Sequence, residues 1–128
     1  MEHPIVEKIL KEGINSVNLS MLDESARKRI LRDVGDKLYK ENKIHEAVEI
    51  LTKANDMEKL AEMGDAFLAQ GRGELAALCF IPTKDNQRLS NAAVQCINAK
   101  NYRLAAQAYE AADNRQMADF IRQNFVEV

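Results

Sequence analysis

Four pairs of residues in this chain are of types that can do chemistry: Gly71 and Gly73, His3 and His45, Cys79 and Cys96, and Asp36 and Asp65. The glycines open the stretch GRGELAALCF, directly ahead of an apolar run. A glycine pair in that place can form a loop whose backbone N–H groups hold a phosphate at a helix N-terminus. The same pair can equally form a plain turn between two packed helices.

The other three pairs give little support for an active site. Neither histidine has a cysteine or a second histidine at the spacing of metal ligands, and both cysteines lie in apolar runs, as reduced core residues do. The two aspartates are expected to face solvent or to pair with Arg32, Lys40 or Arg72. Because G-x-S-x-G, Walker and Rossmann motifs are also missing, we expect no catalytic residue, no metal and no cofactor.

Charge and composition narrow the class of protein. The chain has 128 residues, with 18 basic and 20 acidic side chains interspersed and a net charge of −2. Nucleic-acid-binding proteins usually have a basic excess, so no nucleic acid is expected as a partner. No run reaches the roughly 18 apolar residues of a membrane span, and no signal peptide is visible. We therefore expect one cytoplasmic domain over residues 1–128, with no membrane insertion.

The chain repeats itself with a period of 29 residues. Residues 34–60 laid over residues 63–89 match Gly35 with Gly64 and Ala47 with Ala76, and a third copy follows at the same shift. Each copy has two runs of apolar residues spaced three and four apart, the period of a helix face. Small residues at fixed places let paired helices approach closely. The repeat predicts an all-α, right-handed α-solenoid of antiparallel helix pairs with roughly eight helices.

Capping residues and prolines set the expected boundaries. A short N-terminal helix starts at Pro4 and ends at Gly13, and a polar connection completes residues 1–19. Ser20 with Asp23 starts a long helix through Lys40, and three helix pairs fill residues 20–112.

The second half of each copy supplies further signals. Asp56, Asp85 and Asp113 are expected to cap the helix that follows each copy, with the third copy one residue shorter than the second. Pro82 should end a helix near Phe80. Residues 113–128 form a C-terminal capping segment, whose helix over 115–124 is expected to cover the open end with Met117, Phe120 and Ile121.

The repeat also indicates which of the two interpretations of Gly71 and Gly73 applies. Gly71 and Gly73 occupy the columns that hold Asn42 and Ile44 in the first copy, and Lys100 and Tyr102 in the third. These residues suit a helix-to-helix turn, which glycine and asparagine favour because they adopt a left-handed backbone. The sequence therefore predicts a turn at residues 71–73, and the phosphate-loop interpretation is dropped.

The pattern of large, small and large residues, followed by alanine and an aromatic, resembles the tetratricopeptide repeat over residues 29–112. In the first copy it is carried by Leu31, Val34, Gly35, Leu38, Ala47, Leu51 and Ala54. That family usually repeats every 34 residues. The shorter pitch looks more like the α-solenoids of coatomer, clathrin heavy chain and intraflagellar-transport proteins. The resemblance implies protein binding and, through the coat proteins, a role in protein transport within a larger assembly.

The resemblance also implies which residues contact the partner, because the family binds on the concave face of the first helices. That face would present Arg32, Asp36, Tyr39, Lys40, Lys43, Asp65, Leu68, Arg72, Val94, Ile97, Asn98 and Asn101. Tyr39, Leu68 and Ile97 share one repeat position and would form an apolar stripe that suits an amphipathic helix or an extended peptide. Alternatively, the stripe packs under the N-terminal helix or against a second copy of the chain.

Three functions remain open from the sequence. The first is a protein-interaction scaffold that binds a peptide or helix of a partner on the concave face or at the solenoid ends. The second is a self-assembling structural subunit or a segment of a larger coat complex, which makes a homo-oligomer possible. The third is a regulator that binds a small ligand or nucleic acid.

Overall fold

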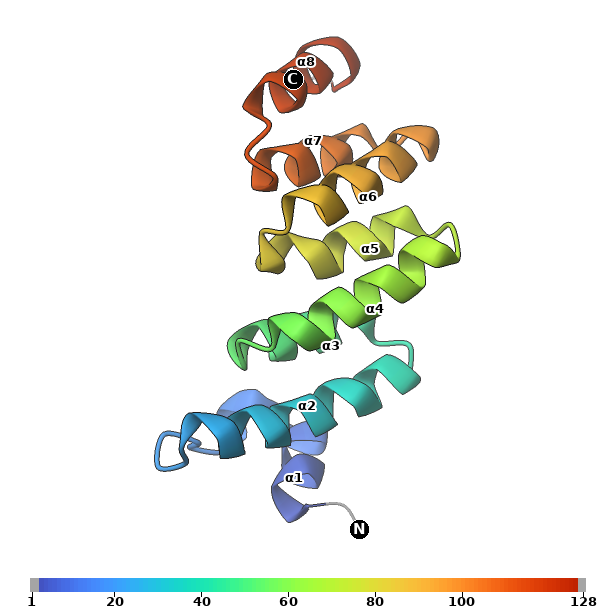
Figure 1. The fold of residues 1–128 in the computed structure, drawn as a ribbon. Helices are drawn as coiled ribbons and strands as arrows, with labels where there is room; N and C mark the ends of the chain where they lie inside the picture. Colours follow the sequence, from blue (N-terminus) through green and yellow to red (C-terminus); the bar gives the residue numbers. More distant parts are fainter. Residues whose placement is uncertain (1–2, 127–128) are drawn as a thin grey trace. The chain divides into compact units, whose positions relative to one another are not determined.

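The computed structural model describes residues 3–126 (Figure 1). Within that range all regular structure is helical, with eight α-helices and two short 3-10 turns. Helices that are neighbours in the sequence pack on one another, as in an α-solenoid. The predicted all-α helical-repeat fold is confirmed.

The chain divides into two compact units, residues 1–59 and residues 60–128. The first unit contains α1 (Pro4–Glu12), a 3-10 turn (Ile14–Ser16), α2 (Glu24–Lys40), α3 (Ile44–Lys53) and the start of α4 (Met57–Ala69). In this unit α2 packs against both α1 and α3. The single domain expected over residues 1–128 stays a prediction.

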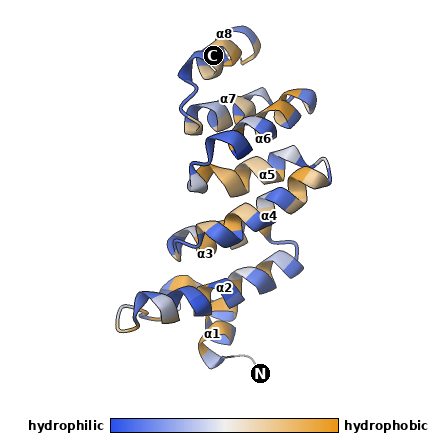
Figure 2. Cartoon of the chain, viewed as in Figure 1, coloured by the Kyte–Doolittle hydropathy of each residue, from blue (hydrophilic) through white to orange (hydrophobic). Residues whose placement is uncertain are grey.

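The second unit contains the rest of α4, α5 (Gly73–Phe80), a 3-10 turn (Ile81–Thr83), α6 (Asn86–Asn98), α7 (Tyr102–Ala111) and α8 (Arg115–Phe125). Here α6 packs against α5 and α7, and α7 packs against α8. In Figure 2 hydrophobic colour dominates α5, where five of the eight residues are buried. Pro82 lies in the 3-10 turn that follows α5, so the predicted helix end at Phe80 is confirmed.

The 29-residue period holds to the end of the described chain. The helices α3, α5 and α7 begin at Ile44, Gly73 and Tyr102, and α4, α6 and α8 begin at Met57, Asn86 and Arg115. The prediction that the third copy is one residue shorter is therefore wrong. Asn114, not Asp113, caps α8 by accepting a hydrogen bond from the Met117 N–H at 3.2 Å. Asp113 instead takes the left-handed backbone, with φ 62°, as Lys84 and Asn55 do one and two copies earlier.

The predicted start of the long helix also needs correction. The Asp23 carboxylate accepts a hydrogen bond from the Ala26 N–H at 2.7 Å, and α2 begins at Glu24. Ser20 lies before this cap, in a turn closed by the Leu22 N–H donating to the Leu19 carbonyl at 3.1 Å. A single N-cap carboxylate thus replaces the predicted pair.

The turn at residues 71–73 is confirmed. Gly71 has the left-handed backbone, with φ 73°, and the Arg72 N–H donates to the Phe67 carbonyl at 2.9 Å, which ends α4. Gly73 is buried at the start of α5, where an added Cβ would lie 2.2 Å from the Gln95 Cβ. Gly71 therefore serves the turn, and Gly73 serves the close approach of α5 to α6.

The small residues at Gly35 and Gly64 bring paired helices together, as the repeat predicted. A Cβ added to Gly35 would lie 2.9 Å from the Leu51 side chain, and one added to Gly64 would lie 2.2 Å from the Phe80 ring. Leu51 and Phe80 occupy the same repeat position and are fully buried. The first contact lies within residues 1–59 and the second within residues 60–128.

The last helix buries only part of the face expected. Ala118 and Ile121 are the buried residues of α8, and Met117 is half-buried. Phe120 is 52% exposed, so the expectation that it covers the end of the chain is wrong. No helix in the described part of the chain is long and apolar enough to cross a membrane.

Candidate interaction surfaces

Arg32 is held by an intramolecular ion pair with a buried carboxylate. Asp56 is 0% exposed, and its two oxygens accept from Nε and Nη2 of Arg32, each at 2.6 Å. The same carboxylate caps α4 by accepting from the Lys59 N–H at 3.2 Å. Burial tends to raise the pKa of Asp56, but the Arg32 and Lys59 hydrogen bonds outweigh it and hold that pKa below its ordinary value. Arg32 therefore has a structural role in residues 1–59.

A second ion pair recurs one repeat apart. Lys59 Nζ lies 2.9 Å from an oxygen of Asp36, and Arg88 Nε donates to Asp65 at 2.8 Å. Both partners are shifted by 29 residues, so this is one interaction built twice, once in each unit. The expected pairing of Asp36 and Asp65 with Arg32, Lys40 or Arg72 is wrong. The shared offset of Lys59 and Arg88 is the signal in the sequence that could have revealed it.

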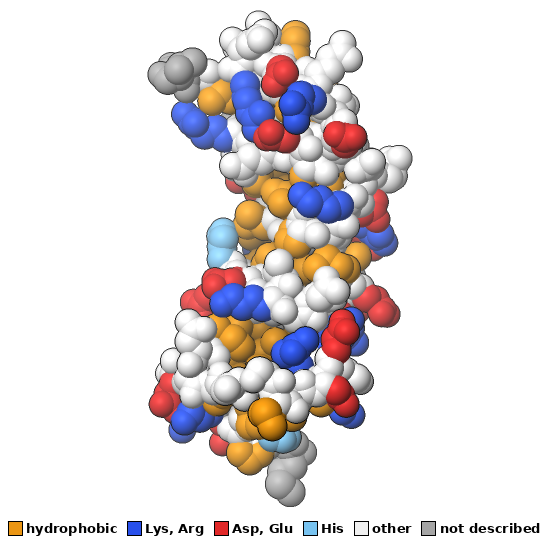
Figure 3. Space-filling view, turned by 90° about the vertical axis from the view of Figure 1, so that its left-hand side faces the viewer, with side chains coloured by type: hydrophobic (Ala, Val, Ile, Leu, Met, Phe, Trp, Pro, Cys, Tyr) orange, Lys and Arg blue, Asp and Glu red, His pale blue; other side chains and the backbone are white. Residues whose placement is uncertain are grey.

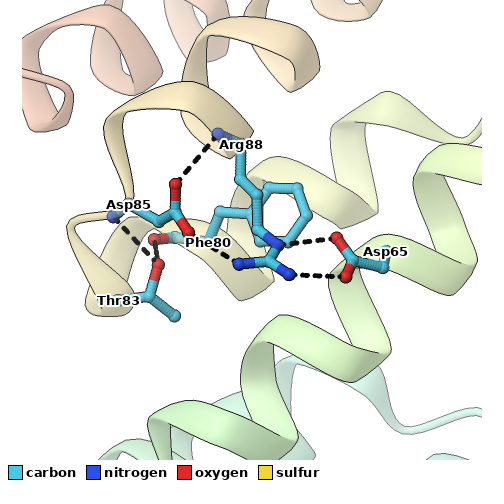
Figure 4. Close-up of polar contacts among 5 residues, drawn as sticks. All are labelled: Asp65, Phe80, Thr83, Asp85 and Arg88. Atoms are coloured by element: carbon cyan, nitrogen blue, oxygen red, sulfur yellow. Dashed lines mark hydrogen bonds and ion pairs between the residues drawn. The ribbon is translucent and has the colours of Figure 1, made fainter.

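In the second unit this pair belongs to a larger network (Figure 4). Arg88 Nη2 donates to the other oxygen of Asp65 at 2.9 Å, and its Nη1 donates to Asp85 at 2.7 Å. Asp85 also accepts from the backbone N–H of Arg88 at 3.2 Å, which caps α6. Hydrogen bonds from the backbone and side chain of Arg88 hold the pKa of Asp85 below its ordinary value. The network fixes α6 to α4 and leaves Asp65 occupied within the chain.

These carboxylates give the stability of the protein a predictable dependence on pH. The pKa of Asp56, that of Asp85 and that of Glu110, which accepts from Arg122, all lie below their ordinary values in the folded state. A lowered folded pKa contributes stability above the unfolded pKa of about 4, which is lost as pH falls through the folded pKa.

We therefore expect urea titrations followed by circular dichroism to give a free energy of unfolding that falls below about pH 4. The Asp56→Asn variant should show a shallower decrease over the same range, because one of the linked protons is removed. An equally steep decrease in that variant would contradict the role given to Asp56.

Three further predicted residues lie at the N-termini of the second helices of the repeats. Lys43, Arg72 and Asn101 are the N-cap residues of α3, α5 and α7. The Asn101 side chain accepts from the Leu104 N–H at 3.2 Å and donates to Glu74 at 2.8 Å. The Arg72 guanidinium lies over the Phe67 ring, 5.2 Å from its centroid, within cation–π range. Lys43 is exposed, with its Nζ 3.7 Å from Glu41.

The predicted apolar stripe is only half accessible. Tyr39, Leu68 and Ile97 are each half-buried, the first in residues 1–59 and the other two in residues 60–128. In the second unit Gln95 Nε2 donates to the Leu68 carbonyl at 3.1 Å, which ties α6 to the end of α4. Lys40 and Asn98 are exposed on α2 and α6. Whether any of these residues contacts a partner stays a prediction.

Val94 differs from its repeat equivalents. It is 50% exposed on α6, at the position that Asp65 holds on α4. The equivalent of Arg88 one repeat later is Met117 on α8, so the repeat position of the ion pair carries two apolar side chains in the third copy. Within the second unit, the positions that carry an ion pair in one copy of the repeat therefore carry apolar side chains in the next.

Two aromatic side chains are exposed on α8, and we call Met117, Phe120 and Phe125 the α8 apolar surface. Phe120 and Phe125 are each 52% exposed. Their rings meet edge to face with centroids 6.3 Å apart, and Phe125 stacks on Tyr102 at 4.8 Å. Phe120 stands where earlier copies have Asp33, Glu62 and Asn91. From the sequence we expected Phe120 to cover the open end of the solenoid, whereas the polar residues at its repeat position would have indicated an exposed side chain.

Charge is mixed over the rest of the visible surface. On the face shown in Figure 3, side chains of both signs are interspersed with small apolar patches. Cys79 and Cys96 are free and buried, and burial raises the pKa of Cys79 to about 12 and that of Cys96 to about 11. Within residues 3–126 no group of three or more His, Cys, Asp or Glu side chains could hold a metal ion.

Comparison of the chain with known proteins finds no matching family model, no matching curated protein and no matching solved structure.

Proposed function

We propose that this chain is a non-enzymatic protein-interaction scaffold, and that residues 60–128 bind a peptide or helix of a partner protein through the α8 apolar surface. The observation that carries the proposal is the exposure of Phe120 and Phe125 on a helix whose other face packs on α7. Exposed apolar clusters on folded proteins commonly mark interaction sites. Aromatic side chains are favoured there because each covers a large area with few rotatable bonds.

The contacts elsewhere in the unit support this choice of surface. Asp65 is bound to Arg88, and Asn101 is bound to Glu74, so both are already satisfied within the chain. A partner that competed for them would have to replace these hydrogen bonds at no net gain. A partner that covers Met117 and Phe120 breaks no hydrogen bond of their side chains, and it removes apolar area from water. The binding partner that fits is the apolar face of an amphipathic helix.

Affinity capture from native lysate, with mass spectrometry, tests the proposal. Phe120→Ser should lose the captured partner, since a buried aromatic anchor commonly contributes about 2 kcal/mol or more to binding. Met21→Ser is the control, because Met21 is an apolar side chain in the other unit that is 91% exposed, more accessible than Phe120 at 52%. A partner retained by Phe120→Ser, or lost equally with Met21→Ser, would contradict the proposed surface.

A second candidate function is self-assembly through the same surface. An aromatic patch on one helix can pair with its own copy about a two-fold axis, which is the commonest symmetry of homo-oligomers. Light scattering would then give a mass that rises with concentration for the wild type and stays monomeric for Phe120→Ser. A monomeric mass for both the wild type and Phe120→Ser would contradict self-assembly and leave the partner-binding scaffold as the proposed function.

A further inference from the structure

A groove in residues 1–59 has an apolar floor and an acidic rim. It has a volume of about 320 Å³ and lies between α1, α2 and α3. Ile9, Val34, Leu38 and Ile50 form the floor, each at most 7% exposed. Leu10 and Ile14 are half-buried on one wall, and Glu46 and Glu49 are exposed on the opposite wall, which α3 provides.

Glu46 departs from the repeat. Its equivalents one and two copies later are Leu75 and Leu104, which are half-buried on α5 and α7. Those two helices pack against each other in the second unit. In α3 the same position lines the open groove and carries a carboxylate where the repeat elsewhere places an apolar side chain.

The two carboxylates are available to a partner. Glu46 and Glu49 are three residues apart and so lie on one face of α3. Glu49 has only an exposed contact with Lys53, at 3.7 Å, and among the described residues Glu46 makes no ion pair. Exposed contacts of this kind are worth little, so an incoming cation can replace Lys53 at small cost. The rim therefore favours positive charge above an apolar floor.

We infer that this groove binds a basic amphipathic helix of a partner protein, with aliphatic side chains on the floor and Lys or Arg beside Glu46 and Glu49. The volume lies at the small end of ligand pockets, which suits a few anchoring side chains. The charge of the rim selects a basic helix over an acidic one, because like charges across an interface are strongly disfavoured. The inference rests on the proposed protein-binding function but uses a different unit and different residues.

The test uses a synthetic helical peptide of about 14 residues made of Ala, Leu and Lys, with Leu on one stripe and Lys beside it. A matched peptide has Glu at every Lys position. Methyl NMR of the full chain reports where each peptide binds, because Ile9, Ile14 and Ile50 line the groove while Ile97 and Ile121 lie in the other unit. The Lys peptide should shift the first three methyls, and the Glu peptide should bind much more weakly.

The Glu46→Lys variant should lower the affinity of the groove for the Lys peptide by about fivefold to tenfold, because an attraction between opposite charges becomes a repulsion between like charges. Asp119→Lys is the control, as it makes the same charge change at an exposed site on α8. Equal binding of the two peptides would overturn the inference, as would unchanged affinity in Glu46→Lys. Chemical shift changes confined to Ile97 and Ile121 would overturn the inference about the groove and would show that the peptide binds to residues 60–128. The proposed scaffold function would then still hold. Groove shifts caused by raising the protein concentration alone would mean that a second copy is the occupant.

Discussion

Replacing Arg32 with methionine is expected to destabilise residues 1–59 by about 2–4 kcal/mol. The change leaves the Asp56 carboxylate buried without its bidentate partner, although it keeps the hydrogen bond from the Lys59 N–H. Loss of one member of a buried ion pair usually costs about 3–5 kcal/mol. We expect a lower value because the Arg32 side chain is 39% exposed and water reaches that end of the pair.

The size of the effect should depend on which partner is removed. Asp56→Asn keeps a capping oxygen for α4 and leaves Arg32 able to turn toward water, so it should cost less than Arg32→Met. Combining the two changes should recover part of the loss, because no buried charge remains unpaired. Urea titration measures the total, and amide hydrogen exchange should place the loss of protection in α2 and α3. An Arg32→Met variant as stable as the wild type would contradict the structural role of Arg32.

Replacing Gly64 with valine should have an effect of similar size in the other unit, about 3 kcal/mol or more. Even a single added carbon at this position would lie 2.2 Å from the Phe80 ring. Phe80 is fully buried, and a flat ring cannot withdraw into a free rotamer as a flexible side chain can. The helices α4 and α5 would therefore have to separate.

Ala66→Val is the matched control, because Ala66 is exposed on the same helix and the change costs only the helix propensity of valine, about 0.5 kcal/mol. Cys79 and Cys96 provide a local readout, since both are buried in the second unit and have raised pKa values. Their reaction with a thiol reagent should become faster in Gly64→Val and stay slow in Ala66→Val. Equal stability of the two variants would show that α4 and α5 are not in close contact.

The fold could be predicted because its signals are local and periodic. Apolar spacing gave the helices, and the 29-residue shift gave their pairing and the small residues at Gly35 and Gly64. Boundaries were less predictable where two candidate caps stood close together, as at Ser20 and Asp23 or at Asp113 and Asn114. There the backbone decides: Asp113 has the left-handed conformation, so the side chain of the next residue caps the helix.

The surface was harder to predict, because a charged side chain does not reveal its partner in the sequence. Arg32, Asp36 and Asp65 were assigned to binding, but each pairs within the chain with a residue 23 or 24 positions away. For the pairs Asp36–Lys59 and Asp65–Arg88, the one signal in the sequence is that both partners recur 29 residues later. The α8 apolar surface was missed because Phe120 was expected to cover the open end of the solenoid, and the polar residues at its repeat position were not compared.

We propose that apolar side chains of the second unit, and not its charged groups, bind the partner. The most direct measurement is the dissociation constant of the complex with the captured protein, for the wild type, Phe120→Ser and Asp65→Asn. We expect at least a roughly tenfold weaker affinity for Phe120→Ser and little change for Asp65→Asn, whose carboxylate is bound to Arg88. Weakening by Asp65→Asn together with unchanged binding by Phe120→Ser would contradict the proposal.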